Sequence, residues 1–175
     1  QGHGGAIAVE EASQPLMHDN TYEANIAGYL TKDAGMGGAV FVSASDISLR
    51  REWFLQNMAF HGGALAVVDG ALDSIIDATF LINIADKDSA GTGMGGACYV
   101  MGTGTDVVMG TPYEPCFFKY NTASLGGALA GDGEAFLRVQ SDTFLHNQAG
   151  YFTGEGEGGA ILLCNQAGGS IGGNG

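Results

Sequence analysis

Acidic side chains are the first groups in this sequence that could carry chemistry. Nineteen Asp and Glu residues stand against six Lys and Arg residues, and the formal net charge is −13. Hydrolysis of a glycosidic bond needs two carboxyl groups at a set separation. Candidate acids are Asp69, Asp73, Asp77, Asp132 and Asp142. Because acids are so common in the chain, chance pairs are expected, and the sequence does not select one pair as catalytic.

Basic residues would be needed for a second chemistry, the proton abstraction that starts polysaccharide cleavage by a lyase. The six are Lys32, Arg50, Arg51, Lys87, Lys119 and Arg138. Arg50 and Arg51 are adjacent, so on a strand they face opposite ways. No two of the six recur at equivalent positions of neighbouring repeats. The sequence therefore favours a protein without catalytic residues, and a carbohydrate-active enzyme, of the lyase or glycoside hydrolase kind, is the alternative.

Metal ligands are sparse. His3 and His61 stand at the same repeat position but two repeats apart, too far to share one zinc ion. The acidic pairs Asp86/Asp88 and Glu155/Glu157 could hold calcium through oxygen ligands, although solvated acidic loops are the simpler interpretation. We therefore expect no resident cofactor, with calcium in these acidic loops as the alternative.

The three cysteines are too few for a disulfide framework. Cys98 falls where an apolar residue is expected and should pack as a small hydrophobic side chain. A Cys98–Cys116 disulfide is left open by the sequence, so the cysteines do not indicate a compartment.

Composition limits the partners. With so few cations the chain is a poor match for nucleic acid, whose binding needs clustered Lys and Arg. No uninterrupted apolar run approaches the roughly 18 residues of a membrane span. Hydrophobic residues make up 45% of the chain and charged ones 14%, which is typical of a chain with a packed core. The 31 glycines follow no three-residue period, so a collagen helix is excluded.

A repeat organises these glycines. The triplet "GGA" begins at residues 4, 37, 62, 95, 126 and 158, and an aromatic residue followed three residues later by Asn lies between successive copies. The five Asn residues of this second motif are Asn25, Asn57, Asn83, Asn121 and Asn147. After each glycine pair, apolar residues alternate with a period of two, which indicates a strand. Segments such as "LDSIIDATFLIN" predict two further short strands in each repeat.

These two motifs resemble the repeat of the polymorphic outer membrane proteins, a family defined by GGA[ILV] alternating with FxxN and found in secreted and cell-surface proteins. The resemblance covers nearly the whole chain and departs from the pattern at Cys98 and Tyr22. It implies an all-β fold, a right-handed parallel β-helix of five to six coils. We expect one β-helix segment over residues 1–175, part of a longer chain, with the Phe residues stacked inside. Each motif Asn should form a structural ladder with the next coil and tolerates the left-handed conformation expected at such corners.

A two-coil period is superimposed on the repeat. The connection from the motif Asn to the next glycine pair alternates between long and short. The third residue after the glycine pair alternates with it: Phe41, Tyr99 and Leu162 follow the long connections, and alanine follows the others. On strand parity these large residues point outward, so we expect each long loop to fold over its own large residue.

The long loops are the predicted partner-contact surface. They carry Tyr29, Leu30, Asp86, Asp88, Tyr151 and Phe152. With the resemblance, this favours a non-enzymatic structural or adhesive protein at the cell surface or outside the cell, within a filament or appendage. The expected partners are protein chains, through self-assembly or neighbouring coils, or surface glycans.

Overall fold

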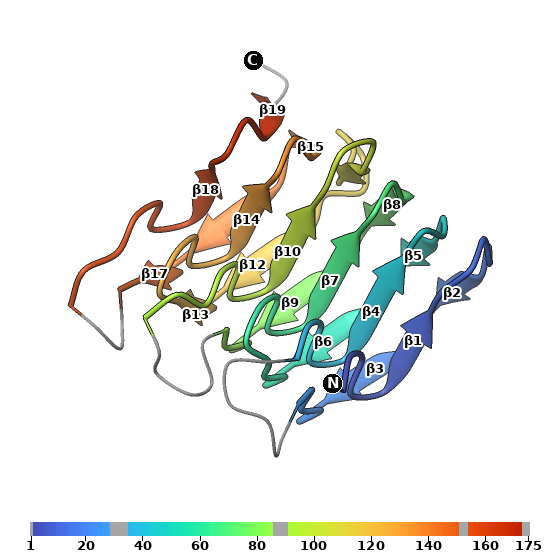
Figure 1. Cartoon of the computed structure of the whole chain (residues 1–175), viewed down its shortest axis with the longest axis horizontal. Helices are drawn as coiled ribbons and strands as arrows, with labels where there is room; N and C mark the ends of the chain where they lie inside the picture. The colour runs from blue at the N-terminus through green and yellow to red at the C-terminus, as the bar shows by residue number, and fades with distance from the viewer. Residues whose placement is uncertain (1, 29–34, 86–90, 151–153, 173–175) are drawn as a thin grey trace.

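The computed structural model describes residues 2–28, 35–85, 91–150 and 154–172. They form a right-handed parallel β-helix, in which each coil of the chain passes through three sheets (Figure 1). The described residues contain strands and turns but no helix. The fold class expected from the two motifs is confirmed.

The first sheet is built from the segments that follow the glycine pairs. Its strands, in spatial order, are β1 (Ile7–Val9), β4 (Val40–Ser43), β7 (Leu65–Val68), β10 (Cys98–Met101), β14 (Leu129–Asp132) and β18 (Ile161–Leu163). All neighbours are parallel, and equivalent residues of the repeat pair, since Val40 lies opposite both Ile7 and Leu65. One "GGA" spacing is therefore one coil.

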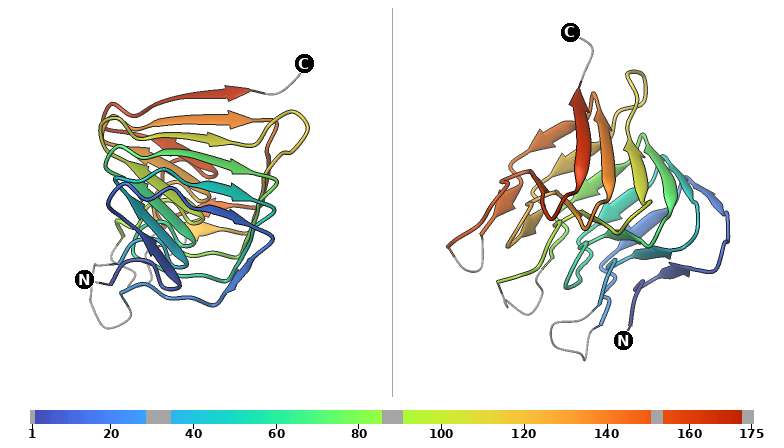
Figure 2. Two further views of the ribbon diagram at one scale, coloured as in Figure 1. Left: turned by 90° about the vertical axis from the view of Figure 1, so that its right-hand side faces the viewer. Right: turned by 45° about the horizontal axis from the view of Figure 1, so that its top comes forward.

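The second sheet follows in all six coils and the third sheet in the first five, so that the coils stack as parallel layers (Figure 2). The second sheet contains β2 (Leu16–His18), β5 (Ser48–Arg50), β8 (Leu72–Ile76), β11 (Asp106–Met109), β15 (Phe136–Gln140) and β19 (Gly168–Gly172). The third sheet contains β3 (Thr21–Glu23), β6 (Trp53–Leu55), β9 (Thr79–Leu81), β12 (Phe117–Lys119) and β16 (Thr143–Leu145). A short pair, β13 (Thr122–Ala123) and β17 (Gln148–Ala149), extends the corner after the third sheet.

The core lies between the three sheets and is filled by every second residue of each strand. In the first sheet the inward residues Val40, Val42, Leu65 and Val67 are fully buried. Cys98 continues this column, also fully buried, as expected for a small hydrophobic side chain. Burial of such columns is the main source of stability for a solenoid.

The aromatic residues of the second motif stack through the core, as predicted. Ring centroids of successive coils lie 4.7–4.8 Å apart along Tyr22, Phe54, Phe80, Phe118 and Phe144. The spacing equals that of neighbouring strands, so each ring lies over the next without tilting the coils.

The predicted asparagine ladder is also present. The amide oxygen of Asn83 accepts hydrogen bonds from the backbone N–H of Asn57, at 2.9 Å, and from its side-chain amide, at 3.1 Å. The Asn83 amide donates to the Phe54 carbonyl and to the Asn121 amide oxygen, at 3.0 Å each. The same bonds link the rest of the ladder, which consists of Asn25, Asn57, Asn83, Asn121 and Asn147.

The expectation that these Asn residues take the left-handed conformation is wrong. The positive φ falls on the preceding residue, which is Ala24, Gln56, Ile82, Tyr120 or His146, with φ between 55° and 57°. The corner therefore turns one residue earlier, and this leaves each Asn side chain aimed along the stack. A β-branched residue such as Ile82 rarely adopts this conformation, so the register of the coils overrides local preference here.

The glycine pair is required by close backbone approach. Gly37 has a φ of 62°, and a Cβ on Gly38 would lie 2.0 Å from the carbonyl oxygen of Gly63 in the next coil. No side chain fits at that distance, and the same approach recurs at the second glycine of each of the first five pairs, so these corners depend on glycine.

The outward face of the first sheet carries a second apolar layer. Phe41 and Tyr99 point outward, yet they are only 6% and 3% exposed. His3 stacks on Phe41 at 4.7 Å and His61 stacks on Tyr99 at 4.8 Å, so each ring is covered by the preceding coil.

Met36 and Met94, the last residues of the two long connections, pack in the same clusters as Phe41 and Tyr99. The rest of the expected loop cover, over residues 29–34 and 86–90, lies outside the described residues.

Tyr99 also makes a polar contact that can be tested. Its hydroxyl donates to the Asp132 carboxylate at 2.9 Å, and burial raises its pKa. We expect Tyr99→Phe to lower the free energy of unfolding by about 1–2 kcal/mol, because a hydrogen bond to a charged group is lost while the ring stays packed. Urea unfolding measures this loss, and Tyr120→Phe, at an exposed ring, is the control. An unchanged midpoint in Tyr99→Phe would contradict the contribution of this bond.

Candidate functional site

The corner between the second and third sheets presents a charged row to solvent. Thr21, Trp53 and Thr79 pair in register on the third sheet. The residues two positions before them, Asp19, Arg51 and Asp77, therefore occupy one corner position in three successive coils. All three have a positive φ, of 60°, 55° and 52°, which turns the chain sharply and leaves these side chains exposed.

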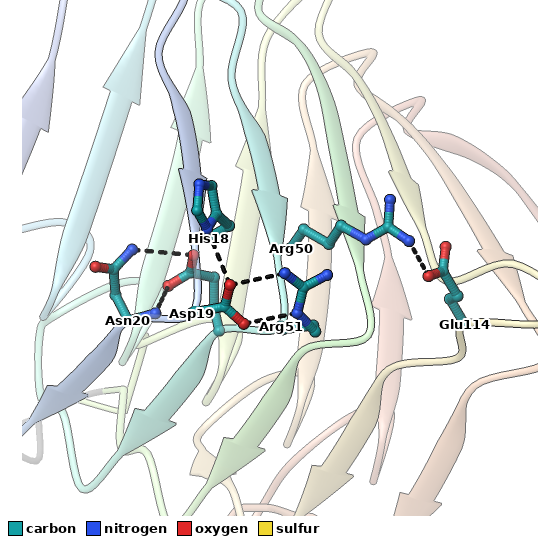
Figure 3. Close-up of polar contacts among 7 residues, drawn as sticks. His18, Asp19, Asn20, Arg50, Arg51 and Glu114 are labelled. Carbon is teal, nitrogen blue, oxygen red and sulfur yellow. Dashed lines mark hydrogen bonds and ion pairs between the residues drawn. The ribbon is translucent and has the colours of Figure 1, made fainter.

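A bidentate ion pair fixes this row (Figure 3). The Arg51 guanidinium donates to both oxygens of Asp19, with Nε–Oδ1 at 2.6 Å and Nη2–Oδ2 at 2.7 Å, and His18 contacts Asp19 at 2.9 Å. Arg51 holds the pKa of Asp19 well below its usual range, and the Asp19 carboxylate raises the pKa of Arg51. The charge of Asp77 acts on Arg51 from the other side. Arg51 is thus held between two carboxylates.

Beneath the row, a buried carboxylate supports the corner. Glu52 is fully buried, and it accepts hydrogen bonds from the backbone N–H and the side-chain amide of Asn20, at 3.2 Å each. Burial raises the pKa of Glu52. Its role is therefore structural, because it satisfies donors of the neighbouring coil in the way that the asparagine ladder does.

The connection over residues 110–116 reinforces the same edge of the solenoid. Glu114 forms an ion pair with Arg50, two coils away (Figure 3), and its carbonyl oxygen accepts from the Asp77 backbone N–H at 3.2 Å. Arg50 is thereby engaged in holding this connection against the body of the solenoid.

A hollow of about 360 Å³ opens beside the charged row. It is lined by Asp19, Asn20, Thr21, Arg51, Trp53, Asp77 and Thr79. Trp53 is 53% exposed, an unusual exposure for so large an apolar ring, and the charged row forms the polar wall opposite it. This is a shallow site with one aromatic platform and fixed hydrogen-bonding groups, a combination typical of ligand recognition.

The acids that could form a glycosidase pair are not assembled into one. Asp73 and Asp142 each accept one backbone hydrogen bond, from Ile47 at 2.7 Å and from Cys116 at 2.6 Å, and burial raises the pKa of each to about 7. They belong to different faces of the solenoid, because Asp73 lies within β8 of the second sheet and Asp142 directly precedes β16 of the third.

The other three acids are also dispersed. Asp69 lies at the turn between the first and second sheets, and Asp77 lines the hollow. Asp132 accepts the Tyr99 hydroxyl. Among the described residues, four of the five, Asp69, Asp73, Asp132 and Asp142, accept hydrogen bonds from neighbouring groups.

The basic residues are likewise engaged with local partners. Arg138, on the second sheet, pairs with Asp106 at 2.7 Å, and Arg51 pairs with Asp19. Lys119 lies over the Tyr120 ring at 4.8 Å. Lys32 and Lys87 lie outside the described residues.

The predicted partner-contact residues are all in the long loops. Tyr29, Leu30, Asp86, Asp88, Tyr151 and Phe152 all lie outside the described residues. Of the residues predicted as calcium ligands, Glu155 and Glu157 are exposed. Within the described ranges, no group of three or more His, Cys, Asp or Glu side chains could hold a metal ion. The loop surface and calcium remain predictions.

The cysteines form no disulfide bond with one another. Cys98, Cys116 and Cys164 are all free thiols, so Cys98 and Cys116 are not bridged. The Cys116 thiol donates to the Ile75 carbonyl oxygen at 3.2 Å instead, and burial raises its pKa to about 12. A thiol that is buried and neutral is a packing element rather than a nucleophile.

Trp53 is the residue that sequence reasoning missed. A signal was present, since the residue before the motif aromatic reads Thr21, Trp53, Thr79, Phe117 and Thr143 in the five copies. Strand parity places this residue on the outward face, next to the buried ring. This outward column is recognised only when the five copies of the motif are aligned on their buried aromatic residue.

Fold and site together define an acidic parallel β-helix with an aromatic and polar hollow on its third sheet. Comparison of the chain with family models, with curated proteins and with solved structures finds no match. In the described part of the chain, no helix has the length and apolar character needed to cross a membrane.

Proposed function

We propose that the chain is a non-enzymatic structural and adhesive β-helix at the cell surface or outside the cell, as part of a filament or appendage. The observation that carries this proposal is the pair of internal ladders. Stacked rings and hydrogen-bonded Asn side chains join the first five coils, each to the next. A solenoid joined in this way is stiff, and its outward side chains are held at fixed spacing along the axis.

The location and partners follow from the composition and the motifs. The GGA and FxxN repeat resembles that of the polymorphic outer membrane proteins, which supports a secreted or surface location. A net charge of −13 disfavours nucleic acid as a partner. Other protein chains or surface glycans remain the proposed partners, reached through outward side chains and the long loops.

The use of the titratable groups supports a non-catalytic role over the alternative of a carbohydrate-active enzyme. The two aspartates with a pKa raised to about 7, Asp73 and Asp142, accept backbone hydrogen bonds of neighbouring coils. Arg50, Arg51 and Arg138 are held in ion pairs. These groups are engaged with neighbouring coils, whereas a catalytic acid or base would have to be free to reach a substrate.

An adhesion assay combined with a turnover assay tests the proposal. Beads coated with the folded chain should be retained under flow on a panel of cell surfaces and polysaccharide-coated surfaces, whereas beads coated with urea-unfolded chain should not. Incubation with neutral and acidic polysaccharides should release neither new reducing ends nor unsaturated products. Turnover that an Arg138→Ala or Asp142→Asn variant abolishes would overturn the proposal in favour of the enzyme, and absence of retention on every surface would remove the adhesive role.

A further inference from the structure

The outward face of the third sheet carries aromatic rings at every second coil. Its first outward column runs Thr21, Trp53, Thr79, Phe117 and Thr143, paired in register. Coils stack at about 4.8 Å, so Trp53 and Phe117 lie about 9.6 Å apart along the axis. Trp53 is 53% exposed and Phe117 is partly exposed, and the small Thr79 lies between them on the same side.

This column has an apolar side and a polar side. The next outward column of the sheet reads Glu23, Leu55, Leu81, Lys119 and Leu145, so it is apolar beside Trp53 and Thr79, and Leu145 is 40% exposed. On the other side lies the charged row of Asp19, Arg51 and Asp77, fixed by the bidentate pair. A ligand on the column would therefore rest on apolar surface and meet rigid hydrogen-bonding groups along one edge.

The chemistry of this surface fits a sugar. One face of a pyranose ring is lined by C–H groups that pack on an aromatic ring, and its hydroxyl groups bind carboxylate and guanidinium groups. Because the row carries two carboxylates and one guanidinium, an acidic sugar would be repelled. The surface therefore favours a neutral hexopyranose.

The two-coil spacing of the rings also restricts the linkage between the sugars of the ligand. In an extended β-1,4-linked chain each sugar advances by roughly one coil spacing, and successive sugars are turned over by half a turn. The same face thus returns at every second sugar, as the rings return at every second coil. An α-1,4-linked chain curves away and would reach only one ring.

We infer that the third sheet binds an extended, neutral β-1,4-linked hexopyranose chain along the solenoid axis, with Trp53 and Phe117 as its two stacking platforms. The inference rests on the proposed function, since it names the ligand class of the adhesive surface. Arg51 and Asp77 would bind the hydroxyl groups of the sugar on Trp53, while the pairing of Arg51 with Asp19 holds the guanidinium in place.

Trp53 is the single tryptophan of the chain, so its fluorescence reports directly on the site. Titration with cellohexaose should shift the tryptophan emission to shorter wavelength, because the indole leaves water. Maltohexaose and hexagalacturonate should give no comparable shift at the same concentration. Absence of a shift with cellohexaose would overturn the inference without any variant.

Substitutions test whether the Trp53 and Phe117 rings are the two stacking platforms. By calorimetry, Trp53→Ala and Phe117→Ala should each weaken cellohexaose binding by about tenfold. Cellobiose, which is too short to reach from one platform to the other, should lose affinity in Trp53→Ala but not in Phe117→Ala. The matched control is Phe136→Ala, at a partly exposed ring on the second sheet, which should bind as the unaltered chain does. Circular dichroism checks that each variant is folded.

Equal affinity of Trp53→Ala and the unaltered chain for cellohexaose would also overturn the inference. Failure of the inferred sugar binding can be distinguished from failure of the proposed adhesive function. Beads that adhere under flow while cellohexaose does not bind leave the adhesive role intact and move its ligand elsewhere. If cellohexaose is bound and also shortened, the inferred surface stands and the non-enzymatic role fails.

Discussion

Asn83→Ala is expected to be among the most destabilising single substitutions in this protein. Asn83, Asn57 and Phe54 are all fully buried. Loss of the Asn83 amide removes the acceptor of two Asn57 donors and the donor to the Phe54 carbonyl. Each buried polar group left without a partner costs about 1–3 kcal/mol, so a loss of about 3–5 kcal/mol is expected. Small proteins have only about 5–15 kcal/mol of stability in total, so this is a large fraction.

Chemical unfolding followed by circular dichroism measures this loss. Gln56→Ala changes the exposed neighbour of Asn57 and is the matched control, with little change expected. Asn147→Ala should lie in between, because Asn147 is partly exposed and water can replace its bonds. A loss of less than about 1 kcal/mol in Asn83→Ala would mean that the ladder contributes little and that the stacked rings hold the coils together.

Asp73→Asn is expected to stabilise the protein at neutral and alkaline pH. Asp73 is 4% exposed and stands in a column of apolar residues, which continues through Val107 in the next coil to Leu137 in the one after it. One carboxylate oxygen accepts from Ile47, and the other has no partner. Burial raises the pKa from 3.8 to about 7, with a further contribution from the charge of Asp46. The charged form is therefore poorly accommodated.

The sign of the pH dependence follows from this pKa. Between pH 4 and 7 the folded state keeps a proton on Asp73 that the unfolded state has released, so stability falls as pH rises through this range. The full effect corresponds to about 4 kcal/mol. We expect Asp73→Asn to gain about 2 kcal/mol at pH 8, since its amide N–H groups also lack partners there, and to show no gain near pH 4.

Urea unfolding at a series of pH values measures this difference. Asp69→Asn, at an exposed turn of the same coil, is the control and should follow the unaltered chain. Asp142, whose pKa is also raised to about 7, acts in the same direction, so some pH dependence should persist in Asp73→Asn. A variant less stable than the unaltered chain at pH 8 would show that Asp73 is held as a favourable charge.

Most of the fold could be predicted because its two motifs mark backbone requirements. The glycine pair marks a corner where no Cβ fits, and the aromatic and Asn residues mark the internal ladders, so their spacing gives the coil length. The left-handed residue could not be predicted. Ile82 and Tyr120 are poor candidates by local preference, and only the register between coils places them there.

The site was harder to predict because it consists of outward residues, which the repeat does not constrain. Asp19, Arg51 and Trp53 have no common type or motif, and they come together only when two neighbouring coils are in register. Asp73 was visible as an acid, and its position two residues before the inward Ile75 already indicates the core. The sequence alone did not single out Asp73, because acidic residues are so common in the chain.

The outward rings of the first and third sheets occur in the same coils. Phe41 and Trp53 belong to the second coil, and Tyr99 and Phe117 belong to the fourth. The unit that repeats the outward rings is therefore a pair of coils. Duplication or loss of a gene segment would keep the spacing of the rings only if it added or removed a whole pair. Chains of this kind should differ in length by even numbers of coils, each added pair bringing one more ring to the third sheet.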